Sequence, residues 1–571
     1  MRVLRPLTLA GLAAGALISL GSCSTPFAVD RAARAPVLDG FGSVAMTATA
    51  DVAAQQLFTR GVLQSYAFND EEAARAYRAA LAADSRCALC AWGVAKAAGP
   101  NINNVDRGDL SDARRHLAWA RRQAQGASAR DRALIDALID RYGDEPAAST
   151  SPTVPVALAS VAVCSAAGTA QAHPLDIVYA ARMRAIADAY PDDADVLVLY
   201  AEAAMIATRA DWWDKKTGES AGEIGVVADR LERALRSRPD HPGLNHFLIH
   251  AVDSSPRPER ALAAADRLGA LAPQASHLVH MPAHIYVRVG RYHDAVRVNE
   301  EAVAAQLRQQ ATLAAQGFAA RNDWNFHNRH FLWFAALTEG RGELALAQAR
   351  ALAGAAAKGK SANAEFVRSL PLLTLVRLER WDEVLGAGAP SGEAGIAAPV
   401  ADYAAGVALV RTGRVAAAHE HAASLRAALD APALRGKTLM GDDPARTVLD
   451  ILSRHLAAEI AAAEQRTDAA SSALAAGSEL EAALNASEPP LLGSMTRLAL
   501  GDLMLRAGRW GDAEHAYRTE LVAQPGSGWA LLGLQRALDR QGRADEARRA
   551  REEGERAWSS ADASLLRLAL R

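Results

Sequence analysis

A short pattern recurs along the chain: a Gly-Arg pair, three further residues and then an alanine. It begins at five glycines, of which the last two are 34 residues apart: Gly290, Gly340, Gly413, Gly508 and Gly542. Glycine adopts the left-handed backbone that ends a helix, and a small alanine early in the next helix lets two helices pack closely. The pattern therefore predicts repeated helix–turn–helix units and limits the fold to architectures that stack them.

A second spacing gives the same period, because Pro239 and Pro273 are also 34 residues apart. This is the period of the tetratricopeptide repeat (TPR). The segment from Gly501 to Pro525 carries the small and aromatic residues of that repeat, and so does an earlier unit around Gly61. Only 5% of the residues are aromatic, which suits close-packed helices better than strands. We expect an all-α fold, an α-solenoid of degenerate TPR-like repeats, since glycine and proline interrupt any long coiled coil.

Six segments, beyond the repeat period, resemble one family of uncharacterised bacterial TPR proteins. They are AFNDEEAARAYRAALAAD at 67–84, CAWGVAKAAGPNINN at 90–104, HFLIHAV at 246–252, HLVHMPAHIYVRVGRYHDA at 277–295, HFLW at 330–333 and LVAQPGSGWALLGLQRAL at 521–538. Together they span most of residues 40–560. The resemblance implies a TPR fold and a location in the cell envelope, and it implies no particular activity.

The N-terminus has the features of an export signal. Arg2 and Arg5 precede an apolar stretch from Leu7 to Leu20, which is too short to span a bilayer and suits a signal-peptide core. The next residues, up to Cys23, resemble the bacterial lipobox, in which the cysteine is lipidated after cleavage; the alternative is an ordinary secretory signal. We expect lipidation at Cys23, with a lipid anchor as the only membrane attachment, on the periplasmic side of the bacterial cell envelope.

The chain is expected to have four parts. Residues 1–22 form the signal peptide, 23–45 a lipid-anchored linker, 46–355 an N-terminal TPR-like array with a histidine-lined groove, and 356–571 a C-terminal TPR-like array. Two stretches interrupt the first array. Gly143 to His173 is rich in Ala, Ser, Thr and Pro and is typical of a loop, and Ala311 to Asp323 lengthens one repeat.

The net charge and the absence of several catalytic motifs exclude some classes of function. The net charge of −2 gives no basic excess, so no nucleic-acid partner is expected. The sequence contains no HExxH, Walker or GxSxG motif. Cys87 and Cys90 form a CxxC without a second pair, which leaves open a redox role, half of a metal site or packing at a helix start. With Cys164, they would lie where disulfides form.

Nine of the 15 histidines lie within residues 241–330. Seven of them fall at matched distances before the turns that end three successive first helices, at Pro256, Gly290 and Gly340. His246, His280 and His330 each lie ten residues before a turn. His250 and His284 lie six residues before a turn, and His277 and His327 lie thirteen residues before one. The other two differ: His241 begins a helix and is expected to be structural, and His293 lies on a second helix, away from the groove.

The matched sites correspond, by resemblance, to TPR positions that line the concave groove. In the preceding unit Glu202 has the position of His250 and His284, and Asp253 and Arg288 fall at neighbouring groove positions. Stacked helices lie about 8–10 Å apart, so inward side chains from adjacent units converge. We expect a histidine-lined pocket with at least one carboxylate.

Three interpretations of this pocket remain open. Each histidine could pack separately, the histidines could bind a metal, or imidazolium and Arg288 could bind an anionic or peptide ligand. Imidazole suits Zn, Cu, Fe and Ni, whereas thiolate zinc is disfavoured because cysteines are few. The expected ligands are His246, His250, His280, His284 and Glu202. The expected supporting residues are His277, His327, His330, Asp253 and Arg288.

Two functions follow. The first is an envelope-anchored scaffold whose concave groove binds a protein, peptide or small ligand through the histidine-rich pocket. The alternative is a metalloprotein whose metal, if one coordination position stays open, activates water or dioxygen as a metal-dependent enzyme. The sequence leaves open whether any reaction is catalysed.

Overall fold

The structure is a computed structural model that describes residues 28–143, 172–208, 212–441, 443–484, 488–493 and 495–569. The signal peptide, Cys23, Cys164 and most of the stretch from Gly143 to His173 lie outside these residues, so the expectations about them stay predictions. Within the described ranges, none of the helices combines the length and the apolar character needed to cross a bilayer.

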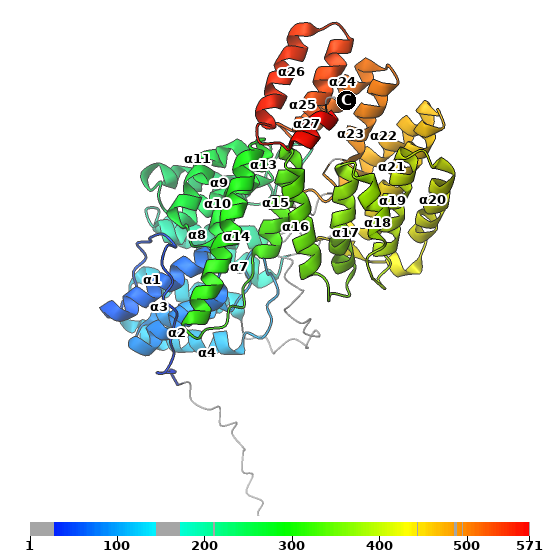
Figure 1. Cartoon of the computed structure of the whole chain (residues 1–571). Coiled ribbons are helices and arrows are strands. Elements are labelled where there is room, and N and C mark those ends of the chain that lie inside the picture. The colour runs from blue at the N-terminus through cyan, green and yellow to red at the C-terminus, as the bar shows by residue number, and fades with distance from the viewer. Residues whose placement is uncertain are drawn as a thin grey trace, which may run out of the picture.

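The described chain is almost entirely helical, and each helix packs mainly against its neighbours in the sequence (Figure 1). This confirms the predicted all-α solenoid of helix pairs. We call the helices up to α16 the first array. They are α1 (Val52–Tyr66), α2 (Asp70–Ala83), α3 (Ala88–Ala97), α4 (Ser111–Gln123), α5 (Ala129–Tyr142), α7 (Pro174–Ala189), α8 (Ala194–Thr208), α9 (Ile224–Ser237), α10 (Pro242–Asp253), α11 (Leu262–Leu271), α12 (Ser276–His280), α13 (Pro282–Arg288), α14 (Tyr292–Ala315), α15 (Asn325–Glu339) and α16 (Gly342–Ala355).

The remaining helices form what we call the second array. They are α17 (Ala362–Arg377), α18 (Trp381–Ala387), α19 (Ala397–Arg411), α20 (Val415–Leu429), α21 (Ala445–Ala463), α22 (Thr467–Ala483), α23 (Met495–Arg506), α24 (Trp510–Ala523), α25 (Gly528–Arg540), α26 (Ala544–Ala557) and α27 (Ala563–Ala569). Two short strands, β1 (Thr438–Leu439) and β2 (Asp443–Pro444), pair antiparallel before α21. Short 3-10 turns occur at Ala124–Gly126, Pro258–Ala261 and Pro432–Leu434.

The expected repeat residues pack as a TPR unit requires. A Cβ added to Gly61 or Gly93 would lie 2.5 Å from the ring of Tyr77, so only glycine admits this aromatic ring between three helices. The same arrangement recurs in the second array, where Tyr517 packs against Gly501 and Gly533. All five glycines of the Gly-Arg pattern have a positive φ, between 73° and 82°, which confirms their predicted role in ending helices.

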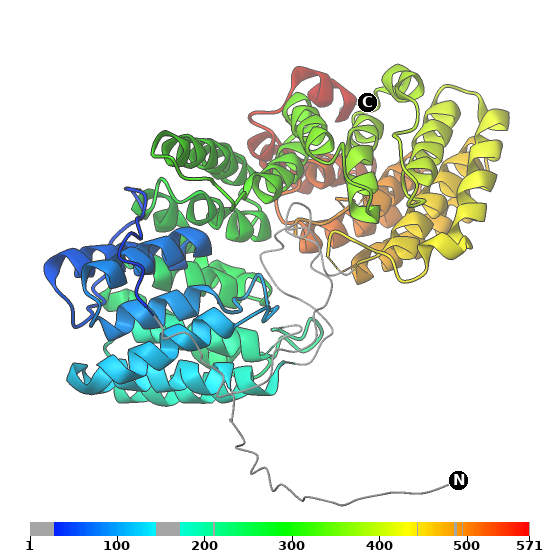
Figure 2. The ribbon, with the colours of Figure 1, turned by 90° about the horizontal axis from the view of Figure 1, so that it is seen from below.

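The first array closes on itself. The segment between α14 and α15, which the sequence predicted to lengthen one repeat, crosses to the turn between α1 and α2 (Figure 2). There the side-chain amide of Asn322 donates to the carbonyl of Phe68 at 2.9 Å, and Arg75 donates to the carbonyl of Ala319 at 3.2 Å. Phe68 is held with a φ of 52°, a left-handed conformation that is uncommon outside glycine. Closure therefore brings Phe68 to the histidine-bearing helices.

The end of the chain folds back onto its middle, where α25 and α27 lie beside α15 (Figure 1). The indole N–H of Trp529 donates to the carbonyl of Leu337, and that of Trp558 donates to the carbonyl of Thr338, both at 2.9 Å. The backbone N–H of Asp562 donates to the carbonyl of Gly340, also at 2.9 Å. These bonds join the two arrays, since α15 belongs to the first and Trp529 to the second.

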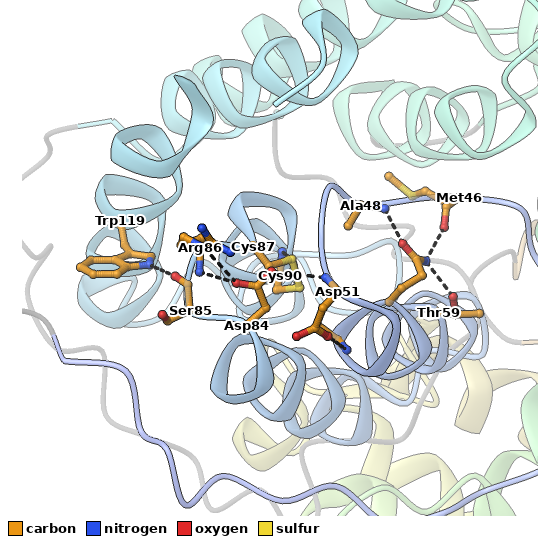
Figure 3. The surroundings of a disulfide bond; sticks show 12 residues. Met46, Ala48, Asp51, Thr59, Asp84, Ser85, Arg86, Cys87, Cys90 and Trp119 are labelled. Atoms are coloured by element: carbon orange, nitrogen blue, oxygen red, sulfur yellow. Dashed lines mark hydrogen bonds and ion pairs between the residues drawn. A yellow bond between two sulfur atoms is a disulfide. The ribbon is translucent and has the colours of Figure 1, made fainter. Parts of the chain in front are cut away.

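Cys87 and Cys90 form a disulfide at the start of α3, and both are fully buried (Figure 3). Beside it the indole N–H of Trp119 donates to the carbonyl of Ser85 at 3.0 Å. A closed disulfide leaves no thiolate to bind a metal. Of the three alternatives for the CxxC, the disulfide disfavours half of a metal site and leaves a redox role and packing at a helix start open.

Candidate metal centre

Helix α10 carries the first two histidines. Pro242 occupies its first turn, where a missing N–H costs nothing, and His241 caps the helix by accepting from the N–H of Leu244 at 3.2 Å. The other ring nitrogen of His241 contacts Asp195 at 3.2 Å, so its expected structural role is confirmed. His246 and His250 follow one helical turn apart, on one face of α10.

The next three histidines lie on a helix that proline divides. Its first part, α12, carries His277 and His280, and its second part, α13, begins at Pro282 and carries His284. Proline has no N–H to continue the hydrogen-bond ladder, and its ring crowds the preceding turn, so the regular helix is interrupted at Met281. The sequence predicted one continuous first helix. The break does not separate the two groups of histidines described below, because His280 before it and His284 after it contact each other at 3.0 Å.

The first group, which we call triad 1, comprises His246, His250 and His277. The Nε2 atom of His246 lies 3.0 Å from Nε2 of His250 and 3.0 Å from Nε2 of His277. One ligand atom from each residue lies within 4.8 Å of the others, and all three side chains are buried. Three ring nitrogens from α10 and α12 therefore face one centre.

The second group, triad 2, comprises His280, His284 and His327. Nε2 of His280 lies 3.0 Å from Nε2 of His284, and the ring of His327 on α15 is centred 4.7 Å from that of His280. Their ligand atoms also lie within 4.8 Å of one another. The two triads adjoin, since the rings of His277 and His280 are 6.3 Å apart.

Hydrogen bonds fix which nitrogen of triad 2 carries the proton. Nδ1 of His280 lies 2.7 Å from Oδ1 of Asn299, whose own amide N–H₂ donates to the carbonyl of Ala295. Oδ1 of Asn299 must accept, so the proton of His280 is on Nδ1. Nδ1 of His284 likewise donates to the carboxylate of Asp253 at 3.1 Å. When both rings are neutral, the lone pair of each is therefore on Nε2, the atom that faces the other ring.

A second carboxyl group reaches His284 from the other array. Glu488, in the connection between α22 and α23, has Oε2 at 3.3 Å from Nδ1 of His284, and together with Asp253 they form a third group of candidate ligands. Burial and then the charge of Asp253 raise the pKa of Glu488. Burial alone would raise the pKa of Asp253, but its hydrogen bond to His284, the charge of His284 and Arg288 outweigh burial and lower it. Asp253 is thus the ionised member of the carboxyl pair.

Burial favours the neutral form in five of the six triad histidines. Burial lowers the pKa of His246 to about 3, with a smaller contribution from the charge of His284. Burial, followed by neighbouring histidines, lowers the pKa well below the usual value in the remaining members for which a shift is resolved: His250, His277, His280 and His327. Neutral imidazole is the form that binds metals.

Aromatic side chains enclose the triads. The ring of Phe68 is centred 4.8 Å from that of His246 and 5.0 Å from that of His277. The ring centroids of Trp324 and His277 are 4.3 Å apart, and those of Phe331 and His284 are 4.5 Å apart. None of the six triad histidines is more than 4% exposed. A low-dielectric shell strengthens any interaction between these nitrogens and a cation.

The structure brings together most of the residues expected from the sequence, in a different grouping. The four expected histidine ligands divide between the triads, two in each. His277 and His327, expected to support the site, complete the triads. Asp253 bonds to His284, and Arg288 donates to the carbonyl of Ser255 at 3.3 Å, near Asp253.

Two expected residues lie apart from the triads. Glu202 on α8 pairs with Lys96 at 2.7 Å and belongs to none of the three candidate ligand groups. His330 stacks on Trp333, with ring centroids 5.6 Å apart. Its Nε2 atom is buried without a hydrogen-bond partner among the described residues.

Sequence reasoning missed Asn299, Glu488 and the enclosing Phe68. Asn299 lies on a second helix, α14, outside the groove positions that guided the prediction. Glu488 and Phe68 come from segments far from residues 241–330 in the chain. Periodicity carries no signal for such residues, because their positions depend on how distant units meet.

The spacing of the ring nitrogens suits a transition-metal ion. Zinc binds histidine nitrogen at about 2.0–2.1 Å, and tetrahedral geometry then places two such nitrogens about 3.3 Å apart. The observed Nε2–Nε2 distances are 3.0 Å. The donor set is imidazole with carboxylate nearby, the set that suits Zn, Cu, Fe and Ni.

Comparison with known proteins adds no function. No protein-family model and no curated protein matches the sequence. Solved repeat proteins align with it: the human IFIT1 dimer with m7Gppp-AAAA (14% identity, 90% of this chain and 92% of that chain, TM-score 0.32), the APC/C hetero-tetramer Cut9-Hcn1 (11%, 91% and 90%, 0.24) and the P58(IPK) TPR domain (11%, 61% and 96%, 0.17). Such low identities and scores transfer no ligand or activity to this chain.

Proposed function

We propose that this TPR-like protein is a metalloprotein whose two adjacent histidine triads each bind a transition-metal ion. The observation that carries the proposal is the contact between His280 and His284. Their Nδ1 protons are committed to Asn299 and Asp253, so in the neutral rings that bind metals two lone pairs face each other across 3.0 Å. A cation between them converts this repulsion into two coordinate bonds.

Triad 1 supports the same conclusion, because one of its nitrogens has more close neighbours than it can bond with hydrogen bonds. Nε2 of His246 contacts two other Nε2 atoms at 3.0 Å. A neutral imidazole nitrogen holds either one proton or one lone pair, so it forms one good hydrogen bond of this kind and not two. A metal ion satisfies all three nitrogens simultaneously.

The chemistry that such a centre allows follows from its ligand number. Three histidines leave a fourth position of a tetrahedral ion for water or a substrate, as in catalytic zinc sites. Asp253 and Glu488 stand beside triad 2, where carboxyl groups orient a histidine ligand and accept protons. We therefore propose that triad 2 is the reactive site, if the protein is an enzyme, and that triad 1 serves metal retention.

The competing interpretation, an anionic or peptide ligand held by imidazolium, has less support. It requires charged histidines, whereas the resolved pKa shifts in the triads are all downward. The rings are also buried beneath aromatic side chains, where a metal ion fits and a peptide does not. Partner binding stays a proposal for the outer surfaces of the solenoid, because repeat arrays present extended surfaces. The lipid anchor at Cys23 and the envelope location stay proposals as well, and the buried Cys87–Cys90 disulfide supports an oxidising compartment.

Elemental analysis of untagged protein tests the proposal. After reconstitution with zinc or copper and removal of loose metal, we expect two ions per chain, one per triad. The variants His250→Gln and His327→Gln should each lose one ion, and the combined variant should lose both. Less than about 0.1 ion per chain in the wild type would overturn the proposal, given the tight binding of three-histidine sites.

A matched control uses histidines outside the triads. His419 and His421 on α20 are paired with Glu464 and Asp402 near the surface. The double variant His419→Gln/His421→Gln removes as many imidazoles as the combined triad variant and should keep both ions. Equal loss from the two double variants would show adventitious surface binding and contradict the proposal.

A further inference from the structure

The second array has a cavity of its own, independent of the triads. It has a volume of about 670 Å³ and is lined by the first helices of five successive units: α17, α19, α21, α23 and α25. Small-molecule sites usually measure 300–1,000 Å³. The inner face of the second array therefore offers room for an organic molecule rather than a single ion.

The charges that line this cavity do not all cancel within it. Arg411 pairs with Glu379 at 2.6 Å and contacts Glu459 at 3.6 Å. Arg536 pairs with Asp502 at 3.3 Å. These pairs account for three of the four lining carboxylates, and the fourth, Asp539, is at the exposed end of α25.

Three further arginines line the cavity: Arg506 and Arg540 are exposed at the ends of their helices, whereas Arg377 is partly buried. Its guanidinium stacks on the ring of Trp529, 4.4 Å from the ring centre, and within the described ranges it forms no hydrogen bond or ion pair. Burial lowers the pKa of Arg377, while Asp502 and other acidic groups partly oppose this. Arginine nevertheless stays charged at neutral pH, so its N–H donors stand ready for an anion.

The rest of the lining supplies an apolar surface and a fixed platform. Trp529 is held by its N–H bond to Leu337 in the first array. Met495 and Leu498 on α23 line the same cavity, and Met495 is held by the hydroxyl of Tyr403 at 2.9 Å. His455 adds no charge, because burial lowers its pKa. The guanidinium of Arg377 thus adjoins aromatic and aliphatic surface.

We propose that this cavity binds a small organic carboxylate with an apolar body. The carboxylate pairs with Arg377, whose planar guanidinium matches it in a forked hydrogen bond, and the apolar body packs against Trp529, Met495 and Leu498. The five lining arginines outnumber the four lining carboxylates by one, and this surplus positive charge matches a monoanion. Stacking on Trp529 fixes the guanidinium before the ligand arrives, which lowers the entropic cost of binding.

Isothermal titration calorimetry with three probes of the same aromatic body tests the proposal: naphthoate, naphthyl phosphate and the neutral naphthamide. We expect naphthoate to bind the full-length protein at least about tenfold more tightly than naphthamide, because only naphthoate forms the charged pair. Naphthyl phosphate should bind no more tightly than naphthoate. Tighter binding of the phosphate would overturn the assignment to carboxylates, and equal binding of naphthoate and naphthamide would overturn the role of Arg377.

Three variants separate recognition from folding. Arg377→Met should weaken naphthoate binding at least about tenfold and leave naphthamide unchanged, while Arg377→Lys, which keeps the charge but loses the fork, should fall between. Arg414→Met is the matched control, because Arg414 is exposed at a turn of the same array and outside the cavity, and it should match the wild type. Thermal unfolding checks that each variant folds. Unchanged naphthoate binding by a folded Arg377→Met or Arg377→Lys protein would refute the proposal.

Discussion

Oδ1 of Asn299 lies 2.7 Å from Nδ1 of His280, and the amide of Asn299 is itself oriented by the carbonyl of Ala295. This bond commits the His280 proton to Nδ1 and points its Nε2 lone pair at His284. The side-chain amide of Asn299, on α14, thus determines which ring nitrogen of His280 carries the proton.

Asn299→Leu should weaken metal binding at triad 2 by about 10–100-fold, because a ligand histidine that loses its orienting acceptor is freer to rotate and to change tautomer. A competition titration against a chromophoric chelator measures the effect. The control is Gln309→Leu, a buried amide on the same helix that belongs to no triad, which should keep wild-type affinity. Equal losses in both variants would point to general damage to α14.

Asp253→Asn should weaken the binding of one of the two metal ions about tenfold and leave the binding of the other unchanged. The reason is that the Asp253 carboxylate accepts its hydrogen bond from Nδ1–H of His284, a triad 2 residue. Stoichiometric titration, in which the two ions bind in separate steps, shows the effect. Simultaneous loss of both ions would mean that the triads act as one site.

The metal-free protein should lose stability as the pH falls. His246 and His330 have folded pKa values of about 3, against an unfolded value of about 6.5. Below pH 6.5 these histidines are protonated in the unfolded chain but stay neutral in the folded chain. The free energy of unfolding therefore falls as the pH falls, until the folded pKa is reached. Each such histidine contributes a slope of about 1.4 kcal/mol per pH unit.

His330→Gln isolates one of these contributions, because His330 belongs to neither triad. Urea unfolding between about pH 6 and 4 should show a slope smaller by about 1.4 kcal/mol per pH unit than that of the wild type. An unchanged slope would show that His330 protonates freely in the folded state.

Gly533→Ala should destabilise the second array by about 1–3 kcal/mol, because its Cβ would lie 2.4 Å from the ring of Tyr517 and the core has no room to give way. Gly511→Ala makes the same chemical change in a helix where the Cβ meets no atom within 4 Å. It should be neutral or stabilising by up to about 1 kcal/mol, through helix propensity. Urea midpoints compare the two, and a common direction of change would contradict the packing argument.

The sequence predicted the repeat architecture because the responsible signals are local. A glycine such as Gly340 that ends a helix, or a Tyr517 that requires small neighbours, carries out its role within one or two units. The same periodicity placed seven histidines on equivalent faces, and six of them form the triads. Register also selected Glu202, which instead forms an ion pair with Lys96 and belongs to no candidate ligand group. The repeat period does not give the position of Lys96.

The sequence by itself thus determined the solenoid of helix pairs and the concentration of histidines in residues 241–330. The tertiary structure decided the division of these histidines into two triads, the tautomers set by Asn299 and Asp253, and the arrival of Phe68 and Glu488 from distant segments. It also placed Trp529 under Arg377 through a contact with the first array. Helical periodicity is a property of neighbouring residues, whereas proton positions and cavity charges depend on groups that only the closure and joining of the arrays bring within hydrogen-bond distance.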